Sequence, residues 1–547
     1  MAGVGASNLS PRAPLPFAAM DDPLAPFRWH PEPELIGLRD PHASRPALER
    51  AGEATWRASL DWLYDEAMVR AMGIPTGYAA LRDTYFGEDG GPGPAPVDPT
   101  TLQAVLDEFT ARIAPHTLNS YHPRALSYFT PPPLVASIAG EVLAQWTNQG
   151  IDVWHAGPVG AFVEEEVVRW LCDLAGYGGT SFGLLTSGGV MANFIAMALV
   201  LDVHLRRLSG ADRPPRGAAL EGVRVYTGDQ THFSIARALD ELGFPPETLV
   251  VLPADGRFRL HAEPVATAIL ADRAAGLRPV AICAVAGSTN TGSVDLVPDL
   301  AALAASEGLW LHVDAAYGGA ARLSARDAGR VAGLELADSV TIDPHKWFFQ
   351  AYDVGALVVR DGAHLHQTFD RSPEYYRGGE TPGGDRAGDG NAAQADAHAG
   401  QLNFYKLGFE GTRRFRALKL WASWKHLGTS GFGRLIERND DLAACLAARC
   451  AEADDLDTLP EEPELSVVCF RHLPGGAAAA TAMPPEELDA HQDWLAAALE
   501  ASGDGWLSTT TLRGRTYLRA GVVNYLTTEA DIDRILSTLR RLAETGA

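Results

Sequence analysis

The sequence predicts an α/β fold built on a large, mostly parallel sheet of seven strands. Short apolar or β-branched runs alternate with helical stretches between residues 183 and 360, as is typical of parallel sheets covered by helices on both faces. With 547 residues, 46% of them apolar, the chain can bury one large core and one or two smaller ones. The expected strands are 183–186, 223–227, 248–252, 279–287, 309–314, 339–342 and 355–360, and the helices between them include 191–208, 264–276 and 298–308.

The stretches on either side of this sheet predict two further parts. Residues 1–120 combine proline-rich segments with amphipathic helices, which indicates a helical arm that packs onto another surface. Residues 121–425 form the expected large domain, and residues 426–547 form a small α+β domain. A segment rich in Gly, Ala and Asp at 377–401 cannot order itself alone, so we expect a mobile loop over about 365–411.

Composition limits the possible partners. The chain carries 69 acidic against 45 basic residues, a formal charge of −24, which repels nucleic acid and anionic membranes and favours small molecules. The five cysteines are scattered, without CxxC pairs or histidines at zinc spacing, so we expect neither a disulfide framework nor a metal site. The N-terminus lacks a signal-peptide pattern and no later segment runs apolar for the length of a bilayer, which predicts a cytoplasmic protein.

A lysine follows the expected strand 339–342 in the string SVTIDPHKWFFQ. Lys346 stands between a buried strand and aromatic residues, where partial loss of water favours the neutral amine that attacks a carbonyl group. A lone lysine is more often an ordinary surface residue. The assignment therefore depends on the residues around it.

Asp314 ends another expected strand, in LWLHVDAAYGG, and is followed by the small residues Ala315 and Ala316, which can lie flat against a planar ligand. Such an aspartate can keep a pyridinium nitrogen protonated. The protonated ring is a better electron sink when a bond at the α-carbon of an amino acid breaks. A helix N-cap is the alternative interpretation.

Two more strand ends carry candidate ligand contacts. In LLTSGGVMANF, Ser187, Gly188 and Gly189 link a strand to a helix, and the amide groups of a helix N-terminus suit a phosphate. A tight turn would explain the same glycines. In GDQTHFSIARAL, His232 follows a strand and could stack on a cofactor ring, although a purely structural histidine is the alternative.

Taken in order, TSGGVMAN, DQTH, AGSTNTGSVD, HVDAAYGG and DPHKW resemble the group II pyridoxal-phosphate-dependent decarboxylases, the family of aromatic-L-amino-acid, glutamate and diaminobutyrate decarboxylases. The resemblance runs from about His122 to the C-terminus. It implies a fold-type-I, aminotransferase-like architecture, pyridoxal 5′-phosphate as cofactor and an obligate homodimer.

The resemblance also implies roles for individual residues. Lys346 would hold the cofactor as a Schiff base and Asp314 would pair with its pyridine nitrogen. His232 would stack on the ring, and Ala316 would pack beneath it. Val190 stands where relatives often have a hydroxyl residue, so that contact must come from a backbone amide or from elsewhere. The other implied cofactor contacts are Gly188, Gly189, Val190, His345 and Asp343 at the phosphate, and Ser288 or Thr289 at the phenolic side of the ring.

In the aromatic branch of the family, a tyrosine of the mobile loop follows the lysine by 29 residues, and here 375 − 346 = 29 leads to Tyr375. Tyr375 is the expected proton donor to the α-carbon after carbon dioxide leaves, with Tyr376 as its rival. Relatives with phenylalanine at this place tend toward oxidative aldehyde formation.

The resemblance places the substrate side chain near two segments. Aromatic residues there suit an aromatic substrate, whereas the carboxylate of Asp152 suits a second amino group, as in diaminobutyrate. Arg413, in TRRFRALKLW, is expected to reach the active-site loop, although a solvated basic helix face explains it equally. The implied substrate contacts are Tyr121, His122, Tyr128, Phe129, Asp152, Trp154 and Arg413.

Together these observations predict a decarboxylase that converts an L-amino acid, an aromatic one as first choice, to its amine and carbon dioxide. A diaminobutyrate or acidic-amino-acid decarboxylase is one alternative. A decarboxylating aldehyde synthase or an aminotransferase on the same fold is another. A cofactor-binding homologue without catalysis is the alternative of a different class.

Overall fold

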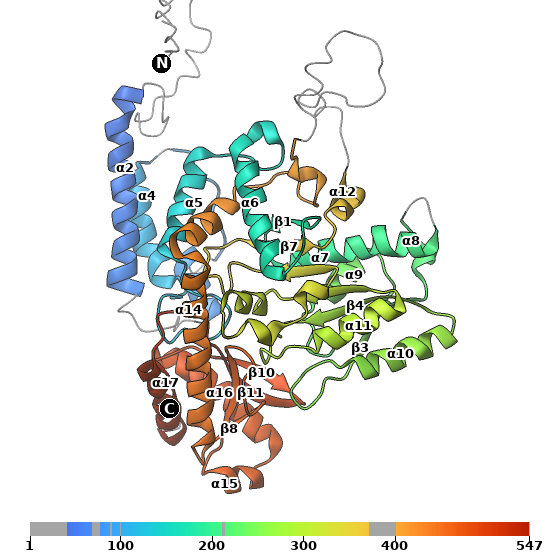
Figure 1. Ribbon diagram of the computed structural model, residues 1–547. Helices are drawn as coiled ribbons and strands as arrows, with labels where there is room; N and C mark the ends of the chain where they lie inside the picture. Colours follow the sequence, from blue (N-terminus) through green and yellow to red (C-terminus); the bar gives the residue numbers. More distant parts are fainter. Residues whose placement is uncertain are drawn as a thin grey trace, which may run out of the picture. The chain divides into compact units, whose positions relative to one another are not determined.

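The computed structural model describes residues 41–67, 77–87, 90–98, 100–210, 214–370 and 401–545 (Figure 1). The chain divides into two compact units. One comprises Met1–Glu66 and Thr76–Thr117, and the other Ala67–Pro75 and Leu118–Ala547.

The first unit is helical. The Thr101 side chain caps one helix by accepting a hydrogen bond from the Ala104 amide at 3.2 Å. The Trp62 indole donates a hydrogen bond to the Thr117 hydroxyl at 3.0 Å, which ties the two ends of this unit together. Its described helices are α2 (Pro41–Asp61), α3 (Tyr78–Phe86) and α4 (Leu102–Glu108).

The second unit contains a seven-stranded sheet in the order β1-β7-β6-β5-β4-β2-β3. Strands β2 to β6 run parallel to one another, and β7 is antiparallel to both β1 and β6. The expected α/β fold with a mostly parallel sheet is therefore confirmed. The strands are β1 (Phe182–Thr186), β2 (Val223–Gly228), β3 (Leu249–Leu252), β4 (Arg278–Val285), β5 (Trp310–Asp314), β6 (Ser339–Ile342) and β7 (Gly355–Val359).

The directions of the strands decide which strand ends lie at the same edge of the sheet. Because β7 is antiparallel to both of its neighbours, β1 points the same way as β6, so the residues that follow β1, β2, β4, β5 and β6 meet at one edge of the sheet. The helices of this part are α5 (Val135–Thr147), α6 (Pro158–Ala175), α7 (Gly189–Leu199), α8 (Arg206–Ser209), α9 (Ser234–Glu241), α10 (Ala262–Ala274), α11 (Val297–Glu307) and α12 (Ala363–Phe369).

The helical stretch 189–209 contradicts one expectation from the sequence. Residues 189–209 are helical, with a mean hydropathy of 1.4, long and apolar enough by composition to cross a bilayer. The expectation that no segment reaches this length was therefore wrong. However, 72% of this stretch is buried inside the fold, and Ile195, Met197 and Leu199 belong to the main core cluster, so core packing accounts for its apolar character.

The C-terminal part of the second unit has its own antiparallel sheet, in the order β10-β11-β9-β8, and a second apolar cluster. The long helix α14 (Ala417–Ala451) is interrupted at Gly428, where φ is 63°. It also packs closely on α5, since a Cβ at Gly140 would lie 2.5 Å from the Lys419 Cα. The other elements are β8 (Leu456–Thr458), β9 (Val467–His472), α15 (Ala477–Ala482), α16 (Pro485–Ser502), β10 (Ser508–Leu512), β11 (Arg515–Gly521) and α17 (Glu529–Thr545).

Candidate active site

A cavity of about 390 Å³ opens at the edge of the large sheet where β1, β2, β4, β5 and β6 end. Parallel strands gather their ligands at this edge, and most of the predicted cofactor contacts lie here. The lining residues are Ser187, Gly188, Gly189, Val190, Met191, Asn193, Gln230, His232, Phe233, Val285, Gly287, Thr289, Asp314, Ala316, Tyr317, Asp343, His345, Lys346 and Tyr352.

Lys346 is one of four lysines in the chain, and the other three do not line this cavity. Its Nζ atom lies 3.1 Å from Asp343 Oδ2, and its side chain is 24% exposed. Asp343 is buried, and its other carboxylate oxygen has no hydrogen-bond partner among the described residues. A partly desolvated amine is thus held at the cavity wall with one carboxylate beside it.

Asp314 ends β5 with a buried carboxylate held from two sides. Its Oδ1 accepts a hydrogen bond from the Ala316 amide at 3.1 Å, and its Oδ2 accepts one from Asn193 Nδ2 at 2.7 Å. The Asn193 amide oxygen in turn accepts from the Thr341 hydroxyl at 2.6 Å and lies 3.0 Å from a ring nitrogen of His312. This chain of contacts fixes the direction in which Asp314 faces the cavity.

Two histidines line the cavity. His232 Nδ1 lies 2.8 Å from the Ser234 hydroxyl, which leaves the opposite ring edge for a ligand. His345 Nδ1 accepts a hydrogen bond from the Val354 amide at 3.3 Å. Burial lowers the pKa of both imidazoles, so both are neutral at neutral pH.

The glycine turn after β1 makes room for a ligand. Helix α7 begins at Gly189, and Gly188 before it has a φ of 154° and offers no side-chain cap. A Cβ at Gly189 would lie 2.8 Å from Asp343 Oδ2, so a side chain there would fill the space beside this carboxylate. The uncapped helix N-terminus at the cavity suits a phosphate. Val190 lines the same wall.

The structure separates the two candidates in AGSTNTG. Thr289 lines the cavity. Ser288 is buried, and its hydroxyl lies 2.8 Å from that of Thr291 and 2.9 Å from that of Ser293. Thr289 is therefore the residue of the two that can approach a ring.

Sequence reasoning missed several residues of this site. Asn193 lies inside an apolar helix. The sequence signal that could have identified it was its position one helical turn after Gly189. Tyr352 lines the cavity, with its ring centroid 4.7 Å from that of His345, and its signal was an aromatic residue shortly after the lysine. Arg519 had no local signal, because the residues it meets lie far away in the sequence.

Arg519 is a buried cation behind the cavity wall. It donates hydrogen bonds to the carbonyl oxygens of Thr289 at 2.8 Å and Ser127 at 2.6 Å, and its guanidinium lies 4.7 Å from the Phe129 ring centroid. Its Nη2 atom is buried without a hydrogen-bond partner in the described structure. A buried guanidinium with unused donor capacity is a candidate anion ligand.

The predicted substrate wall lies outside the lining of this cavity. His122 is buried with its ring against Arg124, and Tyr121 is half-buried nearby. Tyr128 borders a neighbouring cavity of about 410 Å³ that shares Thr289 with the first. The ring of Phe129 stacks on that of the cavity residue Tyr317, with centroids 4.2 Å apart.

The other predicted wall segment is tied to residues after 400. The Asp152 carbonyl accepts a hydrogen bond from the Tyr405 amide at 3.1 Å, and the Trp154 amide donates one to Asn403 Oδ1 at 2.9 Å. The side chains of Asp152 and Trp154 are half-buried. The described structure therefore does not bring these two residues to the cavity.

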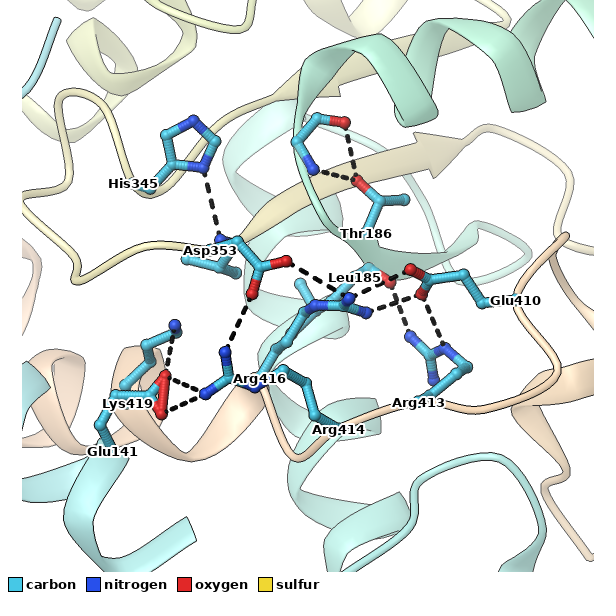
Figure 2. A network of polar contacts seen from close by, with 12 residues as sticks. Glu141, Leu185, Thr186, His345, Asp353, Glu410, Arg413, Arg414, Arg416 and Lys419 are labelled. Carbon is cyan, nitrogen blue, oxygen red and sulfur yellow. Dashed lines mark hydrogen bonds and ion pairs between the residues drawn. The ribbon is translucent and has the colours of Figure 1, made fainter. Parts of the chain in front are cut away.

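Arg413 also lies away from the cavity lining, in the network of Figure 2. It is 1% exposed, forms an ion pair with Glu164 and donates a hydrogen bond to the Leu185 carbonyl at 2.6 Å. Neither the solvated helix face nor a direct approach to a substrate fits a guanidinium buried in this way. Tyr375 and Tyr376 lie outside the described residues.

The arrangement fits pyridoxal phosphate. The cavity offers Lys346 for the aldehyde, Asp314 for the ring nitrogen and His232 for the ring face. The glycine turn at the start of α7 suits the phosphate. In the part of the chain that the structure describes, no group of three or more His, Cys, Asp or Glu side chains is placed to hold a metal ion.

Comparisons with known proteins agree with this site. The family model for the pyridoxal-dependent decarboxylase conserved domain matches residues 89–473. An aromatic-L-amino-acid decarboxylase from Bacillus atrophaeus is 32% identical over 423 residues, which cover 77% of this chain and 82% of the relative. An L-2,4-diaminobutyrate decarboxylase from Rhizobium meliloti (strain 1021) is 32% identical over 486 residues, which cover 89% of this chain and 90% of the relative.

Among solved structures, that of Oryza sativa TDC with PLP and tryptamine is similar, with a TM-score of 0.78 and 26% identity, and the match covers 92% of this chain and 98% of the other. The fold, the cofactor-sized cavity and these relatives agree with one another. The chain therefore belongs to the pyridoxal-dependent decarboxylase family and is a pyridoxal-phosphate-dependent amino-acid decarboxylase.

Proposed function

We propose that this decarboxylase acts on an aromatic L-amino acid and releases its amine and carbon dioxide. One observation carries the proposal: three of the exposed side chains that line the cavity are apolar or aromatic. Phe233 is 55% exposed, Tyr352 is 57% exposed and Val190 is 40% exposed, so these surfaces are free to contact a substrate ring.

The competing substrates lack matching charges at this cavity. Asp314 and Asp343 are its only lining carboxylates in the described chain, and both face the cofactor region. No described arginine lines it. Arg519, behind the cavity wall, is assigned to the α-carboxylate that every amino-acid substrate carries, so an acidic side chain would find no second guanidinium among the described lining residues. Asp152, the candidate partner of a second amino group, is not among them.

The residues of the cavity divide the chemical work. When bound, pyridoxal phosphate supplies the ring that accepts the electron pair left as the bond between the α-carbon and the carboxylate breaks. Asp314 would keep a proton on the ring nitrogen, and His232 would lie against the ring and exclude water. Lys346 Nζ, beside Asp343, would hold the cofactor through its aldehyde group.

The substrate carboxylate needs an anchor, and Arg519 is our candidate. Burial lowers the pKa of this guanidinium, as expected for a buried cation without a carboxylate in contact. It already holds the Thr289 carbonyl of the cavity wall. A guanidinium with an unused donor would hold the carboxylate in one orientation while the bond to it breaks.

A proton must then reach the α-carbon. Tyr375 is the proposed donor and Tyr376 its rival, on the sequence spacing alone, since both lie outside the described residues. Delivery of this proton gives the amine, whereas its failure would open the route to an aldehyde.

A panel of L-amino acids tests the proposal. Purified protein with pyridoxal phosphate is incubated with tryptophan, tyrosine, phenylalanine, 2,4-diaminobutyrate and glutamate, and the products are identified by mass spectrometry alongside carbon dioxide release. The expected result is an aromatic amine, unchanged in the Asp152→Asn variant. Amine from diaminobutyrate alone, lost in Asp152→Asn, would refute the aromatic substrate, and aldehyde or keto acid would refute simple decarboxylation.

We further propose that the protein works as a homodimer. Large apolar side chains on α5 and α6 are exposed: Val135 at 80%, Trp146 at 65%, Val159 at 66% and Phe162 at 54%. Such a concentration of exposed apolar surface favours association. Light scattering after size-exclusion chromatography should give about twice the chain mass of 58.3 kDa, and a monomer in the active fraction would contradict the proposal.

A further inference from the structure

The turn 352–354 connects the cavity to the charged network of Figure 2. Tyr352 lines the cavity beside His345. The Val354 amide donates to His345 Nδ1 at 3.3 Å, and the His345 amide donates to the Val354 carbonyl at 3.1 Å. Both neighbours of Asp353 in the chain therefore contact the same histidine of the cavity.

The Asp353 carboxylate contacts two arginines that lie just before α14. Arg414 Nη1 lies 3.2 Å from Oδ1, and Arg416 Nη2 lies 3.4 Å from Oδ2. Burial by itself raises the pKa of Asp353, but Arg416 and Arg414 hold it below its ordinary value, so the carboxylate is ionised at neutral pH.

Both arginines are fixed by further carboxylates. Arg416, which is buried, contacts Glu410 at 2.6 and 3.0 Å. Arg414 makes a two-oxygen contact with Glu141 of α5 at 2.6 and 2.7 Å, and the buried Lys419 reaches the same carboxylate at 2.6 Å. A guanidinium held in this way loses less freedom when it binds Asp353, which makes the network a firm anchor.

We propose that Asp353 is a positioning residue: its ion pairs with Arg414 and Arg416 hold the turn 352–354, and through that turn His345 and Tyr352, in the geometry that receives the cofactor. Asp353 itself does not line the cavity. The proposal rests on cofactor binding in this cavity, and it assigns to the ion pairs a role beyond fold stability.

The Asp353→Asn variant tests the proposal, because it keeps the size of the side chain and removes its charge. The dissociation constant of pyridoxal phosphate should rise roughly tenfold, equivalent to about 1.4 kcal/mol. The visible circular dichroism of the bound cofactor should change as well, since it reports the ring's orientation. Asp353→Glu should restore much of both signals. Glu166→Gln, which removes a carboxylate paired with Lys425 on the outer side of α14, is the matched control and should change neither.

A second variant covers the case in which Asp353→Asn fails to fold. Arg414 is 39% exposed, so Arg414→Gln is expected to fold, and it should weaken cofactor binding in the same direction but by less. Unchanged cofactor affinity and circular dichroism in folded Asp353→Asn, or in Arg414→Gln if only that variant folds, would overturn the proposal. Cofactor binding by the parent protein separates the two proposals. If the parent binds no cofactor, the proposed function fails. If the parent binds the cofactor and the variants bind it equally well, only the positioning role of Asp353 fails.

Discussion

In the cavity, Lys346 faces one carboxylate, and Asp343 keeps a buried polar atom without a hydrogen-bond partner among the described residues, as does Arg519 behind the cavity wall. In the neighbouring network, Arg413, Arg414 and Arg416 each contact at least one carboxylate. Charged groups with unused bonding capacity are costly in a fold unless a ligand meets them. The cavity thus has both the space and the unused bonding capacity for a cofactor and a substrate. The charges of the network are paired with one another, although Arg413 Nε, Arg416 Nε and Glu164 Oε2 also lack a hydrogen-bond partner among the described residues.

The largest effect should follow from the change that removes the cavity's amine. Lys346→Ala should lower turnover by about 10³-fold or more, because no other lysine lines the cavity to replace it. The thermal unfolding midpoint of the apoprotein should stay close to that of the parent. Lys406→Ala is the control and should keep its activity. Turnover that survives in Lys346→Ala would break the contrast between the two regions.

Breaking the Arg413–Glu164 pair of the network should instead lower the stability of the fold. Arg413→Met leaves the Glu164 carboxylate buried without its partner, which should cost roughly 3–5 kcal/mol of unfolding free energy. Lys425→Met, which breaks the exposed pair with Glu166, should cost at most about 1 kcal/mol. Urea titrations of the apoproteins compare the two. Equally small losses of unfolding free energy in the two variants would show that the buried Arg413–Glu164 pair does not stabilise the fold.

Acidic pH should lower the unfolding free energy through the buried His312. His312 is buried between Asn193 and Ser339, and burial lowers its pKa to about 4. The unfolded chain binds this proton near pH 6.5, so unfolding free energy should fall as the pH drops from about 6.5 to about 4, by up to roughly 3 kcal/mol for this group. His312→Asn should flatten that slope in urea titrations at several pH values. A steeper slope in the variant would contradict the assignment.

The smallest effect concerns the proposed carboxylate anchor. Arg519→Lys keeps the charge but loses the planar donor pair, so KM for the substrate should rise roughly tenfold, or about 1.4 kcal/mol. Steady-state kinetics at saturating cofactor measure this. Arg513→Lys, at an exposed arginine of the same hairpin, is the control. An unchanged KM would show that Arg519 supports the cavity wall and does not bind the substrate carboxylate.

The same contrast explains which residues the sequence could predict. Asp314 ends a strand, and Gly188, His232 and Lys346 each follow one. Parallel strands bring their carboxyl ends to one edge, so the meeting of these residues followed from topology. The strand runs were found, but the antiparallel direction of β7 was not, because an apolar run looks alike in either direction.

Residues whose roles depend on distant partners could not be predicted. From the sequence, Arg413 was interpreted as an active-site or surface arginine, because its partner Glu164 lies 249 residues away. Arg519 contacts Thr289 from the C-terminal sheet, and no local sequence pattern indicates this contact. Asn193 was hidden in an apolar helix, since one polar residue among core side chains carries little signal until its contact with Asp314 is seen.

The central claim is that Lys346 holds the cofactor. Reduction of the holoprotein with sodium borohydride, followed by peptide mass mapping, tests it most directly, because the chain contains only Lys346, Lys406, Lys419 and Lys425 as candidate lysines. The account predicts that the added mass of the reduced cofactor lies on the peptide containing Lys346. Label on another lysine, or on none, would contradict it.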